Sequence, residues 1–323
     1  MESGVSGGIS VDVIVVGGGV IGLTTAVVLA ERGARVRVWT REPVELTTSA
    51  VAGALWWPYR IEPEPLVGEW ALQSLVVYEE LAARPEETGV RMVDGVQGET
   101  RLDELGSWAA RVPGLREARA EEFAGGGLWA RLPLIDMSVH LPWLRNRFVE
   151  LGGTVEEASV VDLSEVPASV VVNCTGLDSL DLVPDRSVRP VRGQLVVVEN
   201  PGITTWLTSV DHSADTSTYF FPQPGGLILG GTAEENAWSM TPDPATAEAI
   251  IARCAAFRPE IAEARVLEHR VGLRPTRPAV RLEREVLRGG RALVHNYGHG
   301  GAGITVAWGC AREAADLVGA RAA

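Results

Sequence analysis

A glycine-rich turn between a buried strand and a helix constrains the fold of this chain more than any other feature. Residues 11–16, VDVIVV, form a continuous apolar run, which is typical of a strand buried on both faces of a parallel sheet. The next segment, IGLTTAVVLAERG, has helical spacing and stops at Gly33, and the run ARVRVW then alternates like a second strand. These segments predict a βαβ unit, and therefore an α/β fold with a parallel sheet.

The turn itself carries the pattern G-x-G-x-x-G at Gly17, Gly19 and Gly22. The first glycine permits a tight turn, the second lets the backbone approach a pyrophosphate, and the third lets the helix pack closely on the strand. The helix start at Val20 and Ile21 offers N–H groups and the positive end of a dipole to phosphates. We therefore predict dinucleotide binding, with a purely structural turn as the lesser alternative.

The acidic residue that usually binds the ribose of the nucleotide is missing. The second strand ends at Val38-Trp39-Thr40-Arg41, and Glu42 follows one or two residues late. Arg41 is compatible with a 2′-phosphate and hence with NADP. The alternative is FAD held by other loop contacts, and the remaining motifs favour FAD.

Two later segments end in loops that a parallel sheet would bring beside the first turn. The run ASVVVNC indicates a buried strand that ends at Thr175 and Gly176, and residues 292–318 indicate a strand, a glycine loop and a helix. Loops at the carboxyl ends of strands meet at one edge, so we expect 17–22, 173–177 and 298–303 to gather there. N–H groups of the last loop would face an electron-rich group such as the flavin C2 carbonyl and N1.

The loop at residues 47–53 differs from the glycine loops, because it places hydroxyl groups beside small residues. The run Thr47-Thr48-Ser49-Ala50-Val51-Ala52-Gly53 has three hydroxyls next to small residues, which suits a close approach of the backbone to a cofactor. An ordinary polar loop is the alternative for this segment.

The length of 323 residues predicts two domains. Short strand candidates between residues 190 and 240 indicate an antiparallel sheet away from the nucleotide unit. We expect a cofactor domain from 1–60, 138–189 and 285–323, and a substrate domain from 61–137 and 190–284.

Composition excludes several other classes of protein. The net charge of −13 argues against a nucleic-acid binder, and no apolar run is long enough for a membrane span. The start, MESGVSGGIS, has no feature of a signal peptide. The three cysteines have no metal-binding spacing, and we expect a reduced cytoplasm with no metal site. A homodimer is left open.

Two residues outside the glycine loops are candidates for substrate binding. Arg274 sits between apolar residues at a predicted strand end, where it would bind either a buried carboxylate of the protein or that of a ligand. Tyr219 lies in an alternating strand and is either a core residue or a ligand for the same group. Arg277, flanked by Thr276 and Pro278, is expected to make structural contacts, whereas Trp56 and Trp57 are candidates for the pocket wall.

Together these motifs resemble the D-amino acid oxidase family of flavoproteins. The resemblance runs from about residue 11 to 318, in the blocks VIVVGGGVIGLTTA, TTSAVAGALWWPY, VVNCTG, VRGQ, TYFFP, LGGT, GLRPTRP and HNYGHGGAGIT. It implies a Rossmann-like FAD-binding domain beside a second α+β substrate domain built on a mixed or antiparallel sheet. It also implies non-covalent FAD, a D-amino acid and molecular oxygen as substrates, and hydrogen peroxide as a product.

The resemblance also implies roles for individual residues. Arg274 matches the arginine that binds the substrate carboxylate, Tyr219 the tyrosine that hydrogen-bonds it, and Gly301 the glycine whose carbonyl accepts from the amine. Leu55 and Trp57 complete the expected pocket. The expected cofactor contacts are Gly17, Gly19, Val20, Ile21, Gly22, Thr40, Arg41, Thr47, Thr48, Gly53, Ala54, Leu55, Val160, Val161, Thr175, Gly176, Gly300, Gly301, Ala302, Gly303, Ile304 and Thr305.

Three positions depart from the family pattern. Asp215 stands where vertebrate-like members carry a second active-site tyrosine, which predicts a short or absent lid. Trp57 replaces a glutamine, and Ala302 replaces a tyrosine of the last glycine loop. The expected reaction is oxidative deamination of neutral D-amino acids by hydride transfer to flavin N5. D-aspartate oxidase, glycine oxidase, an NAD(P)-dependent dehydrogenase and a non-catalytic FAD-binding or sensory module remain as alternatives.

Overall fold

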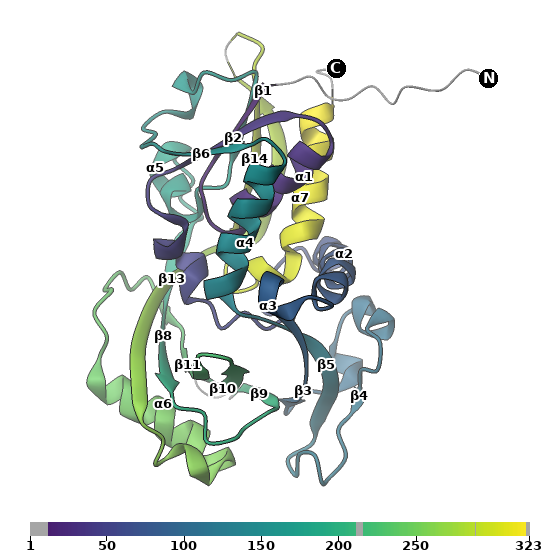
Figure 1. Ribbon diagram of the computed structural model, residues 1–323, viewed down its shortest axis with the longest axis vertical. Coiled ribbons are helices and arrows are strands. Elements are labelled where there is room, and N and C mark those ends of the chain that lie inside the picture. Colours follow the sequence, from purple (N-terminus) through teal and green to yellow (C-terminus); the bar gives the residue numbers. More distant parts are fainter. Residues whose placement is uncertain (1–11, 211–215, 288, 321–323) are drawn as a thin grey trace, which may run out of the picture.

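The strands form one continuous mixed sheet, part parallel and part antiparallel (Figure 1). The computed structural model describes residues 12–210, 216–287 and 289–320. The strand order is β4-β5-β3-β9-β10-β11-β8-β13-β14-β7-β1-β2-β6, and β12 pairs with β8. The strands are β1 (Asp12–Val16), β2 (Arg35–Thr40), β3 (Val90–Gly98), β4 (Arg116–Glu117), β5 (Gly127–Ile135), β6 (Thr154–Glu157), β7 (Val170–Asn173), β8 (Arg189–Val198), β9 (Trp206–Val210), β10 (Thr216–Gln223), β11 (Gly226–Thr232), β12 (Glu234–Glu235), β13 (Val266–Val286) and β14 (Ala292–His299).

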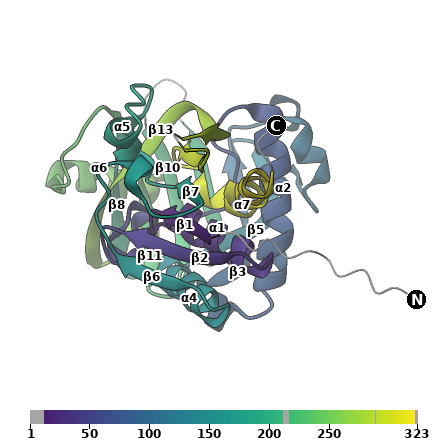
Figure 2. The same cartoon turned by 90° about the horizontal axis from the view of Figure 1, so that it is seen from above.

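Strands β14, β7, β1, β2 and β6 form the parallel half of the sheet. Strands β4, β5, β3, β9, β10, β11 and β8 form the antiparallel half, in which only β3 and β9 are parallel neighbours. Helices cover different faces of the sheet in these two halves. Three of them pack together over the parallel strands, and Figure 2 shows these helices from above. The sixth covers one face of the antiparallel half. The helices are α1 (Val20–Glu31), α2 (Glu64–Leu81), α3 (Pro85–Thr88), α4 (Met137–Glu150), α5 (Ser179–Leu182), α6 (Pro244–Phe257) and α7 (Gly303–Gly319), of which α1, α4 and α7 form the group over the parallel strands.

The predicted βαβ unit is confirmed. Strand β1 pairs in parallel with β2 on one side and with β7 on the other. Val13 and Val15 pack in the core shared with α1 and α7, whereas Ile14 and Val16 pack on the opposite face. Both faces of β1 are therefore buried, which is why its sequence is a continuous apolar run.

The two halves of the sheet are joined by one strand, β13, of 21 residues. Its first part pairs with β8 up to Thr276, and its second part pairs with β14 from Arg281 onward. The sequence interpretation that Arg274 lies at a strand end is therefore wrong. Pro275 does not end the strand, since it stays in register with Pro190 of β8. Pro278 falls within a register shift against β14, between Thr276 and Arg281, which accommodates a residue without an N–H.

The antiparallel half contains strands that sequence patterning missed. Strands β3 and β5 lie in a segment that reads as charged and rich in proline and glycine, and they pair with each other over their whole length. Strand β3 also pairs with β9, more than a hundred residues later in the chain. The division into two domains stays a prediction, because hydrogen bonds continue across the whole sheet.

Two further properties concern location and metals. Within the described ranges, no helix has both the length and the apolar character needed to cross a membrane. Among the same residues, no cluster of three or more His, Cys, Asp or Glu side chains is placed to hold a metal ion.

Candidate active site

The glycine turn after β1 has no room for side chains at two of its positions. Gly17 has a φ of +116°, and a Cβ there would lie 2.4 Å from the Cys174 carbonyl oxygen. A Cβ at Gly22 would lie 1.9 Å from the Gly17 carbonyl oxygen. Only glycine therefore allows the tight turn and the close packing of α1 on it, as the pattern predicts.

The three loops that were expected to meet do lie together at one edge of the parallel strands. Gly17 contacts the loop after β7 through Cys174, whose N–H donates to the Val16 carbonyl at 2.8 Å. A Cβ at Gly303 would lie 3.8 Å from Cδ1 of Ile21, so the last glycine loop reaches the start of α1. Helices α1 and α7 thus begin side by side at this edge.

The loop 47–53 lies against the same helix start, and it supplies a residue that sequence analysis missed. Ser49 accepts a hydrogen bond from the Val20 N–H at 3.0 Å, and a Cβ on Gly19 would lie 3.0 Å from Ser49 Oγ. Ser49 is one of the three hydroxyls of the run noted in the sequence, but it was not among the expected cofactor contacts. Thr47 donates to the Val44 carbonyl, and Thr48 is exposed.

At the end of β2, where an acidic residue would usually bind the ribose, Arg41 is held by acidic neighbours. Arg41 pairs with Asp178 at 2.8 Å and with Glu42 at 3.1 Å, and the charge of Asp178 is the main cause that raises the Arg41 pKa. The NADP interpretation needs a free Arg41, so these pairs count against it. Thr40 is buried and donates to the Glu42 carbonyl. Val160 and Val161 follow β6, with Val161 85% exposed, and their cofactor contacts stay predictions.

The substrate candidates Arg274 and Tyr219 come together on the antiparallel half. Arg274 donates to the Thr232 carbonyl at 2.9 Å. Tyr219 stacks on Phe221 with ring centroids 4.8 Å apart, and its hydroxyl lies within hydrogen-bonding reach of the Arg274 guanidinium. Burial raises the pKa of the Tyr219 hydroxyl, and the Arg274 charge acts in the opposite direction.

Glycines make the space in which these two side chains lie. A Cβ on Gly193 would fall 2.5 Å from an Arg274 guanidinium nitrogen, and a Cβ on Gly230 would fall 2.0 Å from Cζ of Tyr219. Neither glycine was predicted as a site residue. The strand motifs VRGQ and LGGT contain them, but their role depends on strand pairing that the sequence does not state.

The pocket residues on the loop after β2 join both halves of the sheet. Gly53 lies against Phe221 and Tyr219, and Leu55 bridges to Leu134 of β5. The Thr305 hydroxyl bonds to both backbone groups of Trp57, accepting from its N–H at 3.2 Å and donating to its carbonyl at 3.0 Å. The first turn of α7 is thereby tied to the predicted pocket wall. Ala54, in the left-handed region with a φ of 58°, lets the chain turn here.

The last glycine loop reaches from the cofactor side to Arg274. Gly300 has a φ of +55° and its N–H donates to the Pro275 carbonyl at 3.0 Å. A Cβ on Gly301 would lie 3.3 Å from Cδ of Arg274. Ala302, Ile304 and Thr305 are buried. On the other side, Gly176 faces the Pro275 ring, with Thr175 held by Asn173.

Asp215, the position at which a short or absent lid was predicted, lies outside the described residues.

The predicted structural role of Arg277 is confirmed, because it pairs with Asp185 at 2.9 Å. His299 is buried, and its Nε2 has no partner among the described residues. Burial lowers the pKa of His299 to about 3, so its imidazole is neutral.

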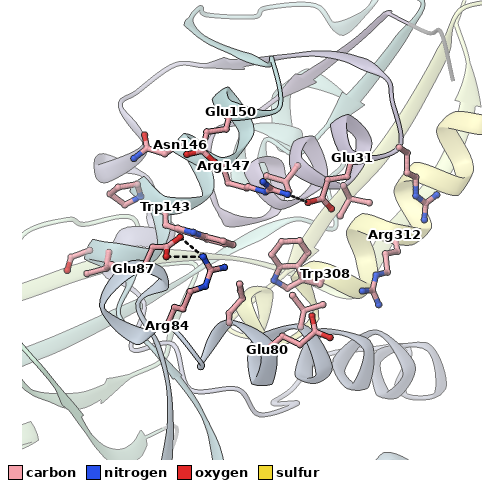
Figure 3. A pocket seen from close by; sticks show the side chains of 18 residues that line it. Glu31, Glu80, Arg84, Glu87, Trp143, Asn146, Arg147, Glu150, Trp308 and Arg312 are labelled. Carbon is pink, nitrogen blue, oxygen red and sulfur yellow. Dashed lines mark hydrogen bonds and ion pairs between the residues drawn. The ribbon is translucent and has the colours of Figure 1, made fainter. Parts of the chain in front are cut away.

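A hollow of about 920 Å³ lies elsewhere, between α1, α2, α3, α4 and α7 (Figure 3). Trp143 and Trp308 line it, and charged side chains at its border pair as Arg84–Glu87 and Arg147–Glu31. None of its lining residues belongs to the glycine loops or to loop 47–53. It is therefore distinct from the candidate active site.

The edge fits a flavin dinucleotide. Two helices begin there, and the first N–H groups of a helix have no partner within the helix. The glycines leave the backbone bare, and the neutral His299 leaves an unsatisfied ring nitrogen in the last loop. A group with a pyrophosphate and a polar ring system would satisfy both ends of such a site.

Comparisons with known proteins identify the family. The chain is 72% identical over 307 residues to a D-amino-acid oxidase of Streptomyces coelicolor, covering 95% of this chain and 96% of that protein. It is 48% identical over 324 residues to a D-amino-acid oxidase of Rubrobacter xylanophilus, covering 98% of both chains. The solved glycine oxidase of Bacillus cereus shares the fold, with a TM-score of 0.79 at 21% identity over 96% of this chain and 97% of that one. Residues 12–317 match the FAD dependent oxidoreductase family, and the chain belongs to that family and uses FAD as its cofactor.

Proposed function

We propose that this protein is a D-amino acid oxidase that converts neutral D-amino acids to 2-oxo acids. Water and molecular oxygen are consumed, and ammonia and hydrogen peroxide are released. One observation carries the proposal: the half-buried Arg274 has no carboxylate partner among the described residues, and it lies beside Tyr219 and Gly301 where the cofactor loops meet.

The other arginines along this part of β13 make the contrast clear. Arg270 pairs with Glu268 at 2.7 Å, Arg277 with Asp185 at 2.9 Å and Arg281 with Glu283 at 2.6 Å. A partly buried guanidinium without such a partner retains donors in a planar fork that suits a carboxylate. The carboxylate of an amino acid substrate would fill that place.

The remaining contacts of the substrate follow from this anchor. Tyr219 donates to the same carboxylate, and the Gly301 carbonyl accepts from the neutral amine. When bound, FAD supplies the hydride acceptor at flavin N5 and passes the electrons to oxygen. The chain therefore acts by orienting the α-hydrogen, which can contribute about 7–11 kcal/mol at most. We propose no general base.

The side-chain pocket favours uncharged substrates. Its proposed wall is formed by Leu55 and Trp57, and Trp57 packs edge-on against Trp108 with ring centroids 5.3 Å apart. Ala302 leaves more room than the tyrosine of related proteins. We assign this pocket to the place where the two proposed domains meet, since Leu55 and Trp57 belong to the cofactor domain (1–60) and Tyr219 and Arg274 to the substrate domain (190–284).

A panel of amino acids tests the proposal. The carboxylate clamp, the amine acceptor and the flavin face fix three directions, so the L-isomer in the same pose places its side chain where the hydrogen must be. Sites built on buried polar contacts discriminate by about 10⁴ or more. We expect peroxide from D-Val, D-Met and D-Phe, little from D-Asp or glycine, and none from L-isomers. Faster turnover of an L-isomer would refute the stereochemistry. Faster peroxide release from D-Asp or glycine than from the neutral D-amino acids would indicate a D-aspartate oxidase or a glycine oxidase.

We also propose that the protein acts in the cytoplasm. The free cysteines Cys174, Cys254 and Cys310 support a reducing compartment. Cell fractionation followed by detection of the protein tests the location. The homodimer stays a prediction, and light scattering of the purified protein measures it.

A further inference from the structure

Asp185 connects the two regions of the candidate active site, although it touches neither ligand. It follows α5 on the connection from the cofactor loop 173–177 to β8. Its side chain is 10% exposed. Its N–H donates to the carbonyl of Ser179, whose hydroxyl in turn interacts with Thr175.

The Asp185 carboxylate is fully engaged. One oxygen accepts from the N–H and the hydroxyl of Ser187. The other accepts from Arg277 Nε at 2.9 Å and from the Tyr297 hydroxyl at 2.8 Å. Burial acts to raise its pKa, but the hydrogen bonds from Ser187, Tyr297 and Arg277 outweigh burial and hold that pKa well below the ordinary value. The group is therefore a carboxylate at neutral pH.

The two partners on Oδ2 lie on the two strands that carry the site. Tyr297 is on β14, directly before the glycine loop, and it also accepts from Arg281 at 2.8 Å. Arg277 is on β13, three residues after Arg274, at the start of the register shift. Between Thr276 and Arg281, β13 advances by five residues while β14 advances by two. These bulged residues lack regular ladder pairing with β14, so other contacts hold them in place. One is the backbone bond from the Val280 N–H to the Glu62 carbonyl at 2.8 Å, and another is the Arg277–Asp185 pair.

Arg274 pairs with Val191 of β8, and the segment that Asp185 anchors follows it directly and contacts the cofactor loops. The Pro275 carbonyl accepts from the Gly300 N–H, and the Pro275 ring lies against Gly176. Arg277 packs on Gly298, since a Cβ there would lie 2.9 Å from Cβ of Arg277. A shift of residues 275–277 would therefore move the carboxylate clamp relative to the last glycine loop.

We propose that Asp185 is a positioning residue for catalysis: through Arg277 and Tyr297 it holds the Arg274 guanidinium in register with the glycine loop at the flavin. This inference rests on the proposed function. It assigns no contact between Asp185 and substrate.

The test compares Asp185→Asn with wild type and with Glu122→Gln as a matched control. Glu122 also accepts from two arginine nitrogens and a backbone N–H, but it lies beside β4, at the far end of the sheet. Three quantities are measured: the KM for D-Met, the Kd for benzoate from flavin absorbance, and the melting temperature. Benzoate reports the carboxylate clamp without turnover.

For Asp185→Asn we expect KM and the benzoate Kd to rise by about ten- to a hundredfold, the size of loss that a displaced contact can cause. We expect Asp185→Asn to retain FAD. We expect Glu122→Gln to have the same KM and benzoate Kd as wild type. If Asp185→Asn does not fold, Tyr297→Phe removes one of the two contacts and should raise the same Kd by a smaller factor.

Unchanged benzoate binding and KM together with a lower melting temperature would overturn the proposal, because Asp185 would then serve stability alone. Failure of the proposed function gives a different experimental result. In that case wild type releases no peroxide from any D-amino acid, whatever the variants do.

Discussion

The parallel half of the sheet presents mainly backbone at the candidate active site, whereas the antiparallel half presents side chains. On the parallel side, Gly17, Gly22 and Gly303 leave the loops and helix starts bare. On the antiparallel side, Arg274 and Tyr219 occupy spaces that neighbouring glycines leave open. The difference matches the ligands, since phosphates accept from N–H groups of any residue, but a substrate carboxylate needs a specific charge.

This comparison predicts that substitutions in the two halves have different effects. A backbone site fails when the chain cannot adopt its path, so its loss removes the cofactor. A side-chain site fails when one group is removed, so its loss leaves the cofactor bound. Variants in each half should therefore separate FAD content from substrate binding.

The largest effect is expected for Arg274→Ala. The substrate carboxylate loses its charged partner in a desolvated site, and such losses are about 2–5 kcal/mol. KM for a good D-substrate should rise accordingly while FAD content stays near that of wild type, as measured by steady-state kinetics and by FAD released on denaturation. Arg270→Ala is the control on the same strand, because Arg270 pairs with Glu268 on the surface. A KM equal to that of wild type would make Arg274 structural.

A smaller effect on the same half is expected for Tyr219→Phe. This change keeps the ring stacked on Phe221 and removes one hydrogen bond to a charged group, which is worth roughly 1.5–3 kcal/mol. We expect kcat/KM to fall by that amount with the melting temperature unchanged. The opposite pattern, full activity with a collapse in stability, would show that the hydroxyl serves only the core.

The parallel half is tested by Gly22→Ala. The added Cβ would lie 1.9 Å from the Gly17 carbonyl oxygen, so the turn or α1 must shift. Overpacking of this kind costs about 1–3 kcal/mol of folding stability. We expect loss of FAD during purification, measured as the ratio of flavin to protein absorbance. Gly225→Ala, where a Cβ meets nothing within 4 Å, is the control and should retain FAD. Full retention of FAD by Gly22→Ala would contradict the view that this turn is a cofactor site.

The sequence by itself determined the regions where structure is local. The turn at Gly17–Gly22 joins a strand to the helix that follows it at once, so apolar runs and glycine spacing suffice to predict the βαβ unit. The glycine loop before α7 was predicted for the same reason. The family also followed from short contiguous blocks, of which HNYGHGG is one.

Only the tertiary structure decided which side chains meet. Strands β3 and β9 pair across more than a hundred residues, and their pairing depends on packing that no local pattern encodes. The continuation of β13 past Pro275 depends on pairing with β8 and β14, so the strand end predicted at Arg274 is absent. Ser49 and Asp185 likewise acquire their roles from partners distant in the chain. Burial and charge pairing arise only in the folded chain. They distinguish Arg274, which has no carboxylate partner among the described residues, from Arg277 three residues away, which pairs with Asp185.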